Sequence, residues 1–160
     1  MSKPYTLNEL LIIMIAREII DHEKTILGIG IPMVAGAMAK ARHAPNAVLM
    51  LESGIVDFSP TVPIKHVADC SASPGFSCSF DLFTAFTMTY SGHVDLCVLG
   101  AAQIDRYGNI NTTVTGTYDD PTIRLPGAGG ATDFLSYSKR AILTMRFGEF
   151  VEKLPYVTSP

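Results

Sequence analysis

The sequence predicts an α/β fold in which an open, mainly parallel sheet is flanked by helices. Of its 160 residues, 48% are hydrophobic, which is enough apolar side chain for one core. Continuous apolar runs alternate with stretches of helical periodicity, and this alternation is typical of parallel strands covered on both faces by helices. Because no repeat or linker-like stretch divides the sequence, we expect one domain spanning residues 1–160.

The helices are predicted from capping residues and apolar spacing. Thr6 and Glu9 form a capping box in front of an apolar series with helical spacing. Pro32 suits the first turn of a second helix, whose small residues in "VAGAMAKA" allow close packing. The expected helices cover roughly residues 7–22, a segment beginning near Pro32, residues 80–91 and a short stretch after Ala131.

The strands are predicted from apolar and β-branched runs that end in turn residues. "AVLML" is an unalternated apolar run of the kind that is buried on both faces, and "INTTVTG" is rich in β-branched residues. The glycine turn in "GIGIP" and the turn residues "RYGN" separate such runs. The expected strands are "KTIL", "AVLML", "VDLCVLGAAQI", "INTTVTG" and "RAILTMRF", at residues 24–27, 47–51, 94–104, 110–116 and 140–147.

Composition and charge argue against several classes of protein. The formal net charge is −3 and Lys and Arg form no stripe, so nucleic-acid binding is not expected. Arg17 and Glu18 interrupt the apolar N-terminal stretch, which therefore predicts neither a membrane span nor a signal peptide. The four histidines and three cysteines show no ligand spacing, so we expect no metal site and reduced thiols in a cytoplasmic protein. Cys70 and Cys78 have no His–Asn or His–Asp arrangement, and we expect buried structural thiols there rather than nucleophiles.

A carboxylate stands where one of the apolar strands ends. Glu52 directly follows "AVLML", and sites in parallel sheets lie outside the carboxyl ends of the strands. A solvated loop acid, or the partner of a nearby lysine, is the ordinary interpretation. The alternative is a nucleophile in a dry crevice, where partial desolvation raises its reactivity and covalent attack divides an acyl transfer into easier steps. Ser53 and Gly54 suit a tight turn, and Gly54 would let a substrate approach the backbone.

The segment "GAGGA" (127–131) is a candidate anion site. Three glycines in four residues exceed what a plain connection needs, although a flexible turn remains an alternative. Consecutive glycine amides at a helix N-terminus can hold an anion or an oxyanion. The segment is not a P-loop, because no Lys-Ser/Thr follows. It also lacks the G-x-G-x-x-G spacing, so nicotinamide binding is not expected.

The segment "AAQIDRYGNINTT" (101–113) is dense in side-chain amides. It contains Gln103, Asn109 and Asn111. A hydrogen-bonded hairpin turn is the ordinary interpretation, since Asn and Gly favour turns. Beside a crevice, the same amides would bind a carbonyl or a carboxylate.

Five stretches together resemble one family. "GIGIP", "ESGIVDFSP", "GAAQIDRYGNINTT", "GAGGA" and the terminal "YVTSP" follow the order seen in family I CoA-transferases, in particular in the β subunits of glutaconate CoA-transferases. The resemblance implies the open α/β CoA-transferase fold, which is NagB/RpiA-like. It also implies an α subunit that builds the site with this chain in a heterodimer or larger hetero-oligomer. Family β subunits usually continue beyond "YVTSP", so this chain lacks the usual C-terminal extension.

The resemblance also implies roles for individual residues. In the family, the glutamate of the "ESG" motif attacks the acyl-CoA thioester, and CoA thiolate then converts the resulting mixed anhydride into an enzyme–CoA thioester. Glu52 occupies this position and is the expected nucleophile. The family's glycine-rich oxyanion motif matches residues 127–131, where we place the catalytic amide at Gly130. The residues expected to lie against the substrate are Ser53, Gly54, Gln103, Asn109, Ala128 and Gly129.

Three functional hypotheses follow. The first is a CoA-transferase β subunit that moves CoA between (di)carboxylic acids, with a coenzyme A thioester as substrate and no bound cofactor or metal. The second is a related cofactor-free decarboxylase of the 3-methylglutaconyl-CoA type, or a hydrolase that opens ring-containing CoA thioesters. The apolar segment "FSCSFDLFTAFTM" (76–88) would then line a pocket for a bulky acyl group, although core packing is the simpler interpretation. The third is a non-catalytic scaffold subunit that stabilises its partner.

Overall fold

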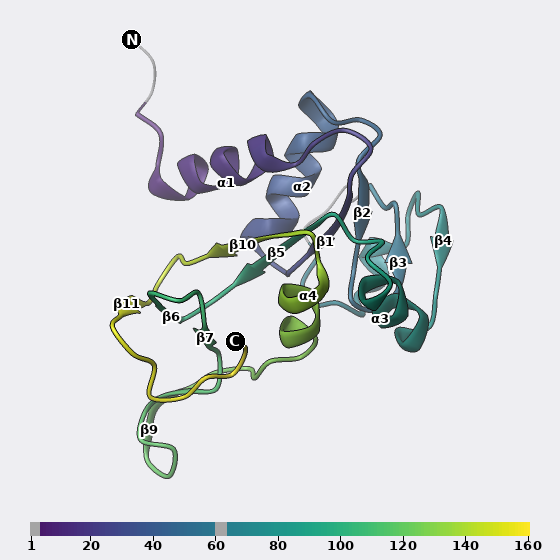
Figure 1. The fold of residues 1–160 in the computed structure, drawn as a ribbon. Coiled ribbons are helices and arrows are strands. Elements are labelled where there is room, and N and C mark those ends of the chain that lie inside the picture. The colour runs from purple at the N-terminus through teal and green to yellow at the C-terminus, as the bar shows by residue number, and fades with distance from the viewer. Residues whose placement is uncertain (1–3, 60–63) are drawn as a thin grey trace.

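A six-stranded mixed sheet forms the centre of the molecule (Figure 1). The computed structural model describes residues 4–59 and 64–160. The strand order is β10-β5-β1-β2-β3-β4; the first four strands are parallel, and β3 and β4 extend the sheet antiparallel. The strands are β1 (Lys24–Leu27), β2 (Val48–Met50), β3 (Ile55–Val56), β4 (Cys78–Ser79), β5 (Leu96–Gly100) and β10 (Arg140–Thr144).

Helices cover both faces of this sheet. The helices are α1 (Leu7–Glu18), α2 (Ile31–Arg42), α3 (Leu82–Tyr90) and α4 (Ala131–Tyr137), with a 3-10 turn η1 (Cys70–Ala72). One core joins α1 and α2 to side chains such as Leu27 and Leu49, and a second joins α3 and α4 to Ile26 and Met50. Neighbouring residues of a strand point to opposite faces, so one short apolar strand supplies both cores. The predicted α/β fold with a mainly parallel sheet is confirmed.

The rest of the chain forms two small sheets beside the central one. The first has the order β11-β6-β7, and the second is the hairpin of β8 and β9. Their strands are β6 (Gln103–Asp105), β7 (Ile110–Asn111), β8 (Val114–Gly116), β9 (Pro121–Arg124) and β11 (Glu149–Val151). Figure 1 shows this part on the side of the molecule opposite β4. Within the residues that the structure describes, no helix is long and apolar enough to cross a membrane.

Close packing of α2 on the sheet depends on Gly36. A Cβ atom at this position would lie 2.3 Å from Leu27 Cδ1 and 3.2 Å from Leu49 Cδ1. Since real Cβ contacts are longer, only glycine lets the helix approach the sheet this closely. The prediction that "VAGAMAKA" packs closely is therefore confirmed.

Several predicted elements were wrong at their boundaries, among them the strand at 140–147, which ends at Thr144. The first helix ends at Glu18 rather than near residue 22, because Ile19 turns into extended conformation and is fully buried. The run at 94–104 is two strands, because Gly100 ends β5 and the chain then enters a different sheet. The run at 110–116 also divides, because Asn111 Oδ1 accepts a hydrogen bond from the Thr113 N–H and turns the backbone there.

The cysteines are all free thiols, but their burial differs from the expectation. Cys97 is buried, and this burial raises its pKa to about 12. Cys78 is partly buried and Cys70 is exposed, so the prediction of a buried thiol at Cys70 was wrong. Cys70 is the first residue of the short turn η1, in which Ala72, and not Cys70, is the residue that enters the core.

A partly buried ion pair fastens β3 to α2. Lys40 of α2 hydrogen-bonds and pairs with Asp57 Oδ1, and Ser77 Oγ donates to Asp57 Oδ2 at 2.7 Å. The hydrogen bond from Lys40, followed by that from Ser77, lowers the pKa of Asp57. Asp57 itself has the left-handed value of φ +56°, and its N–H donates to the Leu49 carbonyl at 2.7 Å. The pair therefore fixes the chain just after the turn that carries Glu52.

We predict that Asp57→Asn destabilises the chain at neutral pH by about 1–2 kcal/mol, the value of a charge-assisted hydrogen bond reduced for partial exposure. Because the folded pKa of Asp57 is lowered, its stabilising effect is present above the unfolded pKa of about 3.9 and is lost as the pH falls through the folded pKa. Chemical denaturation at several pH values measures this difference. Asp119→Asn, at an exposed turn, is the control. An equal loss at neutral and acidic pH would contradict the ion-pair explanation.

Candidate functional site

Glu52 lies at the carboxyl end of β2, in a turn that leads into β3. The Gly54 N–H donates to the Leu51 carbonyl at 2.9 Å, and the Leu51 N–H donates to the Ile55 carbonyl at 2.9 Å. Gly54 has φ +92°, a conformation that L side chains rarely adopt. The turn therefore presents the half-buried Glu52 side chain at the edge of the sheet where the parallel strands end.

Gly54 is also the point where this turn packs against another segment. The Phe80 N–H donates to the Gly54 carbonyl at 2.9 Å. A Cβ atom at Gly54 would lie 2.1 Å from the Phe80 carbonyl oxygen, which is backbone and has no rotamer to change. Gly54, which the sequence suggested as a point of substrate approach, thus has a structural role, because it packs the Glu52 turn against the segment that enters α3.

The glycine-rich segment meets Glu52 from the other side. The Gly130 N–H donates a hydrogen bond to Glu52 Oε1 at 3.2 Å, between residues that are 78 positions apart. A Cβ atom at Gly129 would lie 3.5 Å from Oε1 and 3.6 Å from Oε2 of the same carboxylate. The structure thus brings together Glu52, Gly129 and Gly130, three of the residues predicted for the site.

An aromatic pair holds Gly130 in place. Phe86 of α3 and Phe134 of α4 stack with ring centroids 4.9 Å apart. A Cβ atom at Gly130 would lie 2.5 Å from Phe134 Cε2 and 2.7 Å from Phe86 Cζ. The rings occupy the space that any larger residue would need, so they set the position of the Gly130 N–H relative to Glu52. The apolar segment 76–88 supplies Phe86 to this packing, which fits the core interpretation of that residue.

The neighbouring predicted residues are placed differently. Ser53 follows Glu52, and its Oγ is buried with no hydrogen-bond partner among the described residues. Ala128 lies in the same loop as Gly130, where its carbonyl accepts from the Ala131 N–H at 2.9 Å. Both stay predictions as substrate contacts.

Gln103 and Asn109 belong to the hairpin of β6 and β7. Gln103 is buried; its Nε2 donates to Glu149, and its Oε1 accepts from Asn111 Nδ2 at 2.6 Å. Asn109 Nδ2 donates to Asp105 Oδ2 at 2.9 Å. These hydrogen bonds are what the hairpin-turn interpretation expects. The substrate-binding role predicted for the two residues stays a prediction.

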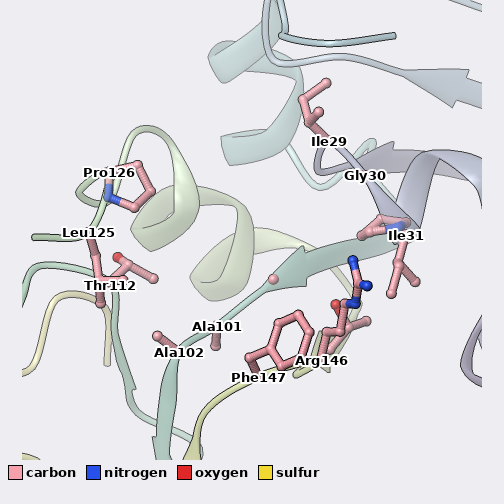
Figure 2. Close-up of a pocket in the computed structure, with 13 residues that line it drawn as sticks. Ile29, Gly30, Ile31, Ala101, Ala102, Thr112, Leu125, Pro126, Arg146 and Phe147 are labelled. Carbon is pink, nitrogen blue, oxygen red and sulfur yellow. The ribbon is translucent and has the colours of Figure 1, made fainter. Parts of the chain in front are cut away.

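A pocket that the sequence did not predict lies at the same edge of the sheet. It has a volume of about 420 Å³ and is lined by segments at the ends of β1, β5 and β10, together with Thr112, Leu125 and Pro126. Figure 2 shows Arg146 and Phe147 on one side of it, with Thr112, Leu125 and Pro126 on the other. The apolar strand ends were visible in the sequence, but nothing in the order of residues showed that Arg146 and Pro126 would face one space.

The surroundings of Glu52 indicate which kind of chemistry the site supports. Within residues 4–59 and 64–160, no group of three or more His, Cys, Asp or Glu side chains is arranged to hold a metal ion. The Glu52 carboxylate accepts its hydrogen bond from a backbone amide. The arrangement thus combines a carboxylate with a peptide donor, which is a set suited to acyl chemistry.

Comparison with known families decides the affiliation of the chain. A family model described as coenzyme A transferase matches residues 8–159. The chain belongs to this family. Its sequence is 35% identical to the B (β) chain of the 3-oxoadipate CoA-transferase of Pseudomonas knackmussii over 97% of this chain, and 33% identical to the B (β) chain of the glutaconate CoA-transferase of Acidaminococcus fermentans over 98%. The chain spans 61% of the length of each of these two relatives.

Solved structures of coenzyme A transferase relatives share the fold described above. The glutaconate coenzyme A-transferase of Acidaminococcus fermentans superposes with a TM-score of 0.86 at 32% identity, covering 98% of this chain and 62% of that one. The decarboxylase AibA/AibB superposes with a TM-score of 0.84 at 26% identity, covering 98% of this chain and 67% of that one. The predicted CoA-transferase fold and family resemblance are confirmed.

We predict that Gly54→Ala destabilises the chain far more than an ordinary glycine substitution. Left-handed backbone costs an L residue about 1–2 kcal/mol, and the clash with the Phe80 carbonyl adds a backbone displacement, so the loss should reach roughly 3–5 kcal/mol. Gly108→Ala is a matched control, because Gly108 has φ +89° and a Cβ atom there would have no neighbouring atom within 4 Å. Denaturant unfolding of both variants measures the difference. Equal losses would show that the contact with Phe80 is not what fixes the Glu52 turn.

Proposed function

We propose that this chain is the β subunit of a heteromeric CoA-transferase that moves CoA between (di)carboxylic acids through a glutamyl-CoA thioester on Glu52. The observation that carries the proposal is the hydrogen bond from the Gly130 N–H to Glu52 Oε1, at 3.2 Å. It places a peptide donor on the carboxylate that the chemistry would transform. The "ESG" and "GAGGA" motifs of the family thus converge on one group.

The first half of the transfer forms and breaks two bonds. The Glu52 oxygen that Gly130 does not bind, Oε2, attacks the carbonyl carbon of the acyl-CoA. The C–S bond then breaks, CoA leaves as its thiolate, and a mixed anhydride joins Glu52 to the acyl group. The thiolate attacks Glu52 Cδ, and the original acid leaves with one former oxygen of Glu52. An acceptor carboxylate reverses these steps, which divides one acyl transfer into several smaller barriers.

The geometry supports a role for the Gly130 amide in one particular intermediate. When thiolate attacks Glu52 Cδ, negative charge develops on Oε1, the oxygen to which the Gly130 N–H already donates. A donor that is oriented before the reaction needs no reorganisation when the charge appears, and one such donor contributes about 3–4 kcal/mol. The packing of Phe86 and Phe134 against Gly130 supplies that orientation.

The proposed enzyme needs a second subunit. We infer that an α subunit of the same family completes the site, and that the acyl-CoA is bound between the two subunits. The coenzyme A thioester acts as substrate, with no further bound cofactor or metal. We place the protein in the cytoplasm and treat residues 1–160 as one domain. Two relatives of this chain, each the B (β) chain of a CoA-transferase, support the presence of a partner subunit.

Decarboxylation is a second candidate function, because a decarboxylase shares this fold. The decarboxylase AibA/AibB superposes on 98% of this chain with a TM-score of 0.84. A decarboxylase on this fold would release carbon dioxide from an acyl-CoA and would form no thioester on Glu52. The pairing of Glu52 with Gly130 favours the transferase, because carbon dioxide loss gives this amide no developing charge on Oε1 to stabilise.

We predict that the complex of this chain with its partner subunit gains a CoA-sized mass on Glu52 when incubated with glutaconyl-CoA. Peptide mapping locates the adduct, and borohydride reduction of a parallel sample traps the thioester as an alcohol. Glu52→Gln should abolish the adduct and lower transfer by at least about 10³-fold, as expected for loss of a nucleophile. Glu152→Gln, at an exposed position, is the control. Turnover to carbon dioxide or free acid without an adduct would refute transfer in favour of decarboxylation or hydrolysis.

We predict that Gly130→Ala slows formation of the Glu52 thioester by roughly 10²–10³-fold, because the added methyl group collides with both phenyl rings and moves the N–H away from Oε1. Rapid-quench measurement of the adduct gives this rate, and the unfolding midpoint of the complex is measured in parallel. Phe86→Leu combined with Gly130→Ala removes one of the colliding rings and should restore part of the rate. An unchanged rate in the single variant would remove Gly130 from the mechanism.

A further inference from the structure

We propose that the pocket between Arg146 and Pro126 binds the acyl chain of a dicarboxylic substrate, and that Arg146 pairs with the carboxylate at the far end of that chain. This inference rests on the proposed transfer at Glu52. The proposal adds a preference for dicarboxylic acids, because Glu52 and Gly130 by themselves would not distinguish dicarboxylic from monocarboxylic acids.

Arg146 and Glu52 lie at the same edge of the central sheet, because they follow its parallel strands β10 and β2. Strands β5 and β1 separate β10 from β2, so the two backbones are three strand spacings apart, or about 14 Å. Figure 2 shows the Arg146 guanidinium directed toward Ile31, which follows β1, and thus along the edge toward β2. The two side chains therefore suit the two ends of a short dicarboxylic chain.

One wall of the pocket directly precedes, in the chain, the loop that carries the Gly130 amide. Leu125 and Pro126 form the wall opposite Arg146. The chain runs from Pro126 directly into the loop whose Gly130 N–H binds Glu52. An acyl group whose thioester lies at Glu52 would enter this pocket beside Leu125 and Pro126.

The size and the walls of the pocket suit an acyl chain. Its volume of about 420 Å³ falls within the range of about 300–1,000 Å³ that is usual for small-molecule sites. Most of its walls are apolar, and they suit methylene groups. These wall residues are Ile29, Ile31, Pro32, Ala101, Ala102, Leu125, Pro126 and Phe147.

Arg146 is the one charged residue among those that line the pocket in the described part of the chain. Its guanidinium stacks on the Phe147 ring, 4.7 Å from the centroid, and forms no ion pair or hydrogen bond within residues 4–59 and 64–160. Helix α2 begins at the same wall, with Gly30 as N-cap and no acidic residue in its first turn, so its end adds positive potential. An unpaired cation at an apolar pocket is ready for one anionic group.

The terminal carboxylate fits this pocket better than the other anions that the substrate carries. The CoA moiety has several phosphate charges, and a site for them needs several cations. This pocket offers one cation and mainly apolar walls, which match a chain with a single terminal charge. Thr112 also lines the pocket, and its buried Oγ1 has no hydrogen-bond partner among the described residues.

The test uses the complex of this chain with its partner subunit and two thioesters with the same main-chain length. Glutaryl-CoA ends in a carboxylate, whereas valeryl-CoA ends in a methyl group. For Arg146→Met, kcat/KM with glutaryl-CoA should fall roughly 10–100-fold, equivalent to one charge-assisted pair, while the value with valeryl-CoA should change by less than about threefold. Arg146→Lys should retain part of the preference. Arg106→Met is the matched control, since Arg106 also stacks on the ring of the residue that follows it.

Binding of free glutarate and free valerate, measured by saturation-transfer NMR, tests the pocket without requiring turnover. The wild-type complex should prefer glutarate, and Arg146→Met should remove that preference. Equal losses with both thioesters would overturn the proposal, because they would show that Arg146 serves CoA or the fold. So would a wild-type complex that binds the two free acids equally. A complex that prefers glutarate through Arg146 but forms no thioester on Glu52 would support the pocket and refute the proposed transfer.

Discussion

The hydrogen bond between the Gly130 N–H and Glu52 is the interaction on which the site depends. It joins segments that are far apart in the sequence and reaches a carboxylate that the sheet carries to its edge. Packing contacts elsewhere in the chain hold the Glu52 carboxylate and the Gly130 amide within hydrogen-bonding distance. The Glu52 turn is fixed by the contact of Gly54 with Phe80, and the Gly130 amide is fixed by Phe86 and Phe134. Glycine is required at both points because neighbouring atoms fill the space of a side chain.

These contacts form a closed path through the molecule. Phe80 leads into α3, α3 carries Phe86, and Phe86 packs on Phe134 of α4, which begins directly after Gly130. The core between α3, α4 and the sheet therefore serves the chemistry as well as the stability of the fold. A donor for developing charge is effective when it is held before the charge appears. The packing explains how a backbone amide in a glycine-rich loop meets that requirement.

The parallel sheet explains why the catalytic pair and the pocket are neighbours. Strands β1, β2, β5 and β10 end at one edge, and each delivers its next residues to the same region. Glu52 and Arg146 come from two of these ends, and the pocket walls come largely from the ends between them and from Leu125 and Pro126. One topological feature thus supplies the proposed nucleophile, the apolar surface and the cation.

The sequence predicted the fold class because it depends on local signals, and the family resemblance singled out Glu52 and Gly130, which the structure brings together. Apolar runs reveal buried strands, and a carboxylate at a strand end or a cluster of glycines is visible in the residue order. The strand break at Gly100 was missed because pairing with a different sheet decides it, and the break at Asn111 was missed because a side-chain hydrogen bond to the Thr113 N–H overrides the β propensity of the run. Arg146 was missed because its relation to Pro126 exists only after the sheet has formed.

The most direct test of the proposed mechanism follows one oxygen atom. The complex is given an acyl-CoA and an acceptor acid whose carboxylate carries heavy oxygen, and the peptide that contains Glu52 is weighed after turnover. Transfer through a mixed anhydride predicts heavy oxygen in the Glu52 carboxylate, because the acceptor leaves one of its oxygens there when Glu52 is regenerated. Turnover that leaves Glu52 unlabelled would contradict the central claim that this carboxylate is the nucleophile.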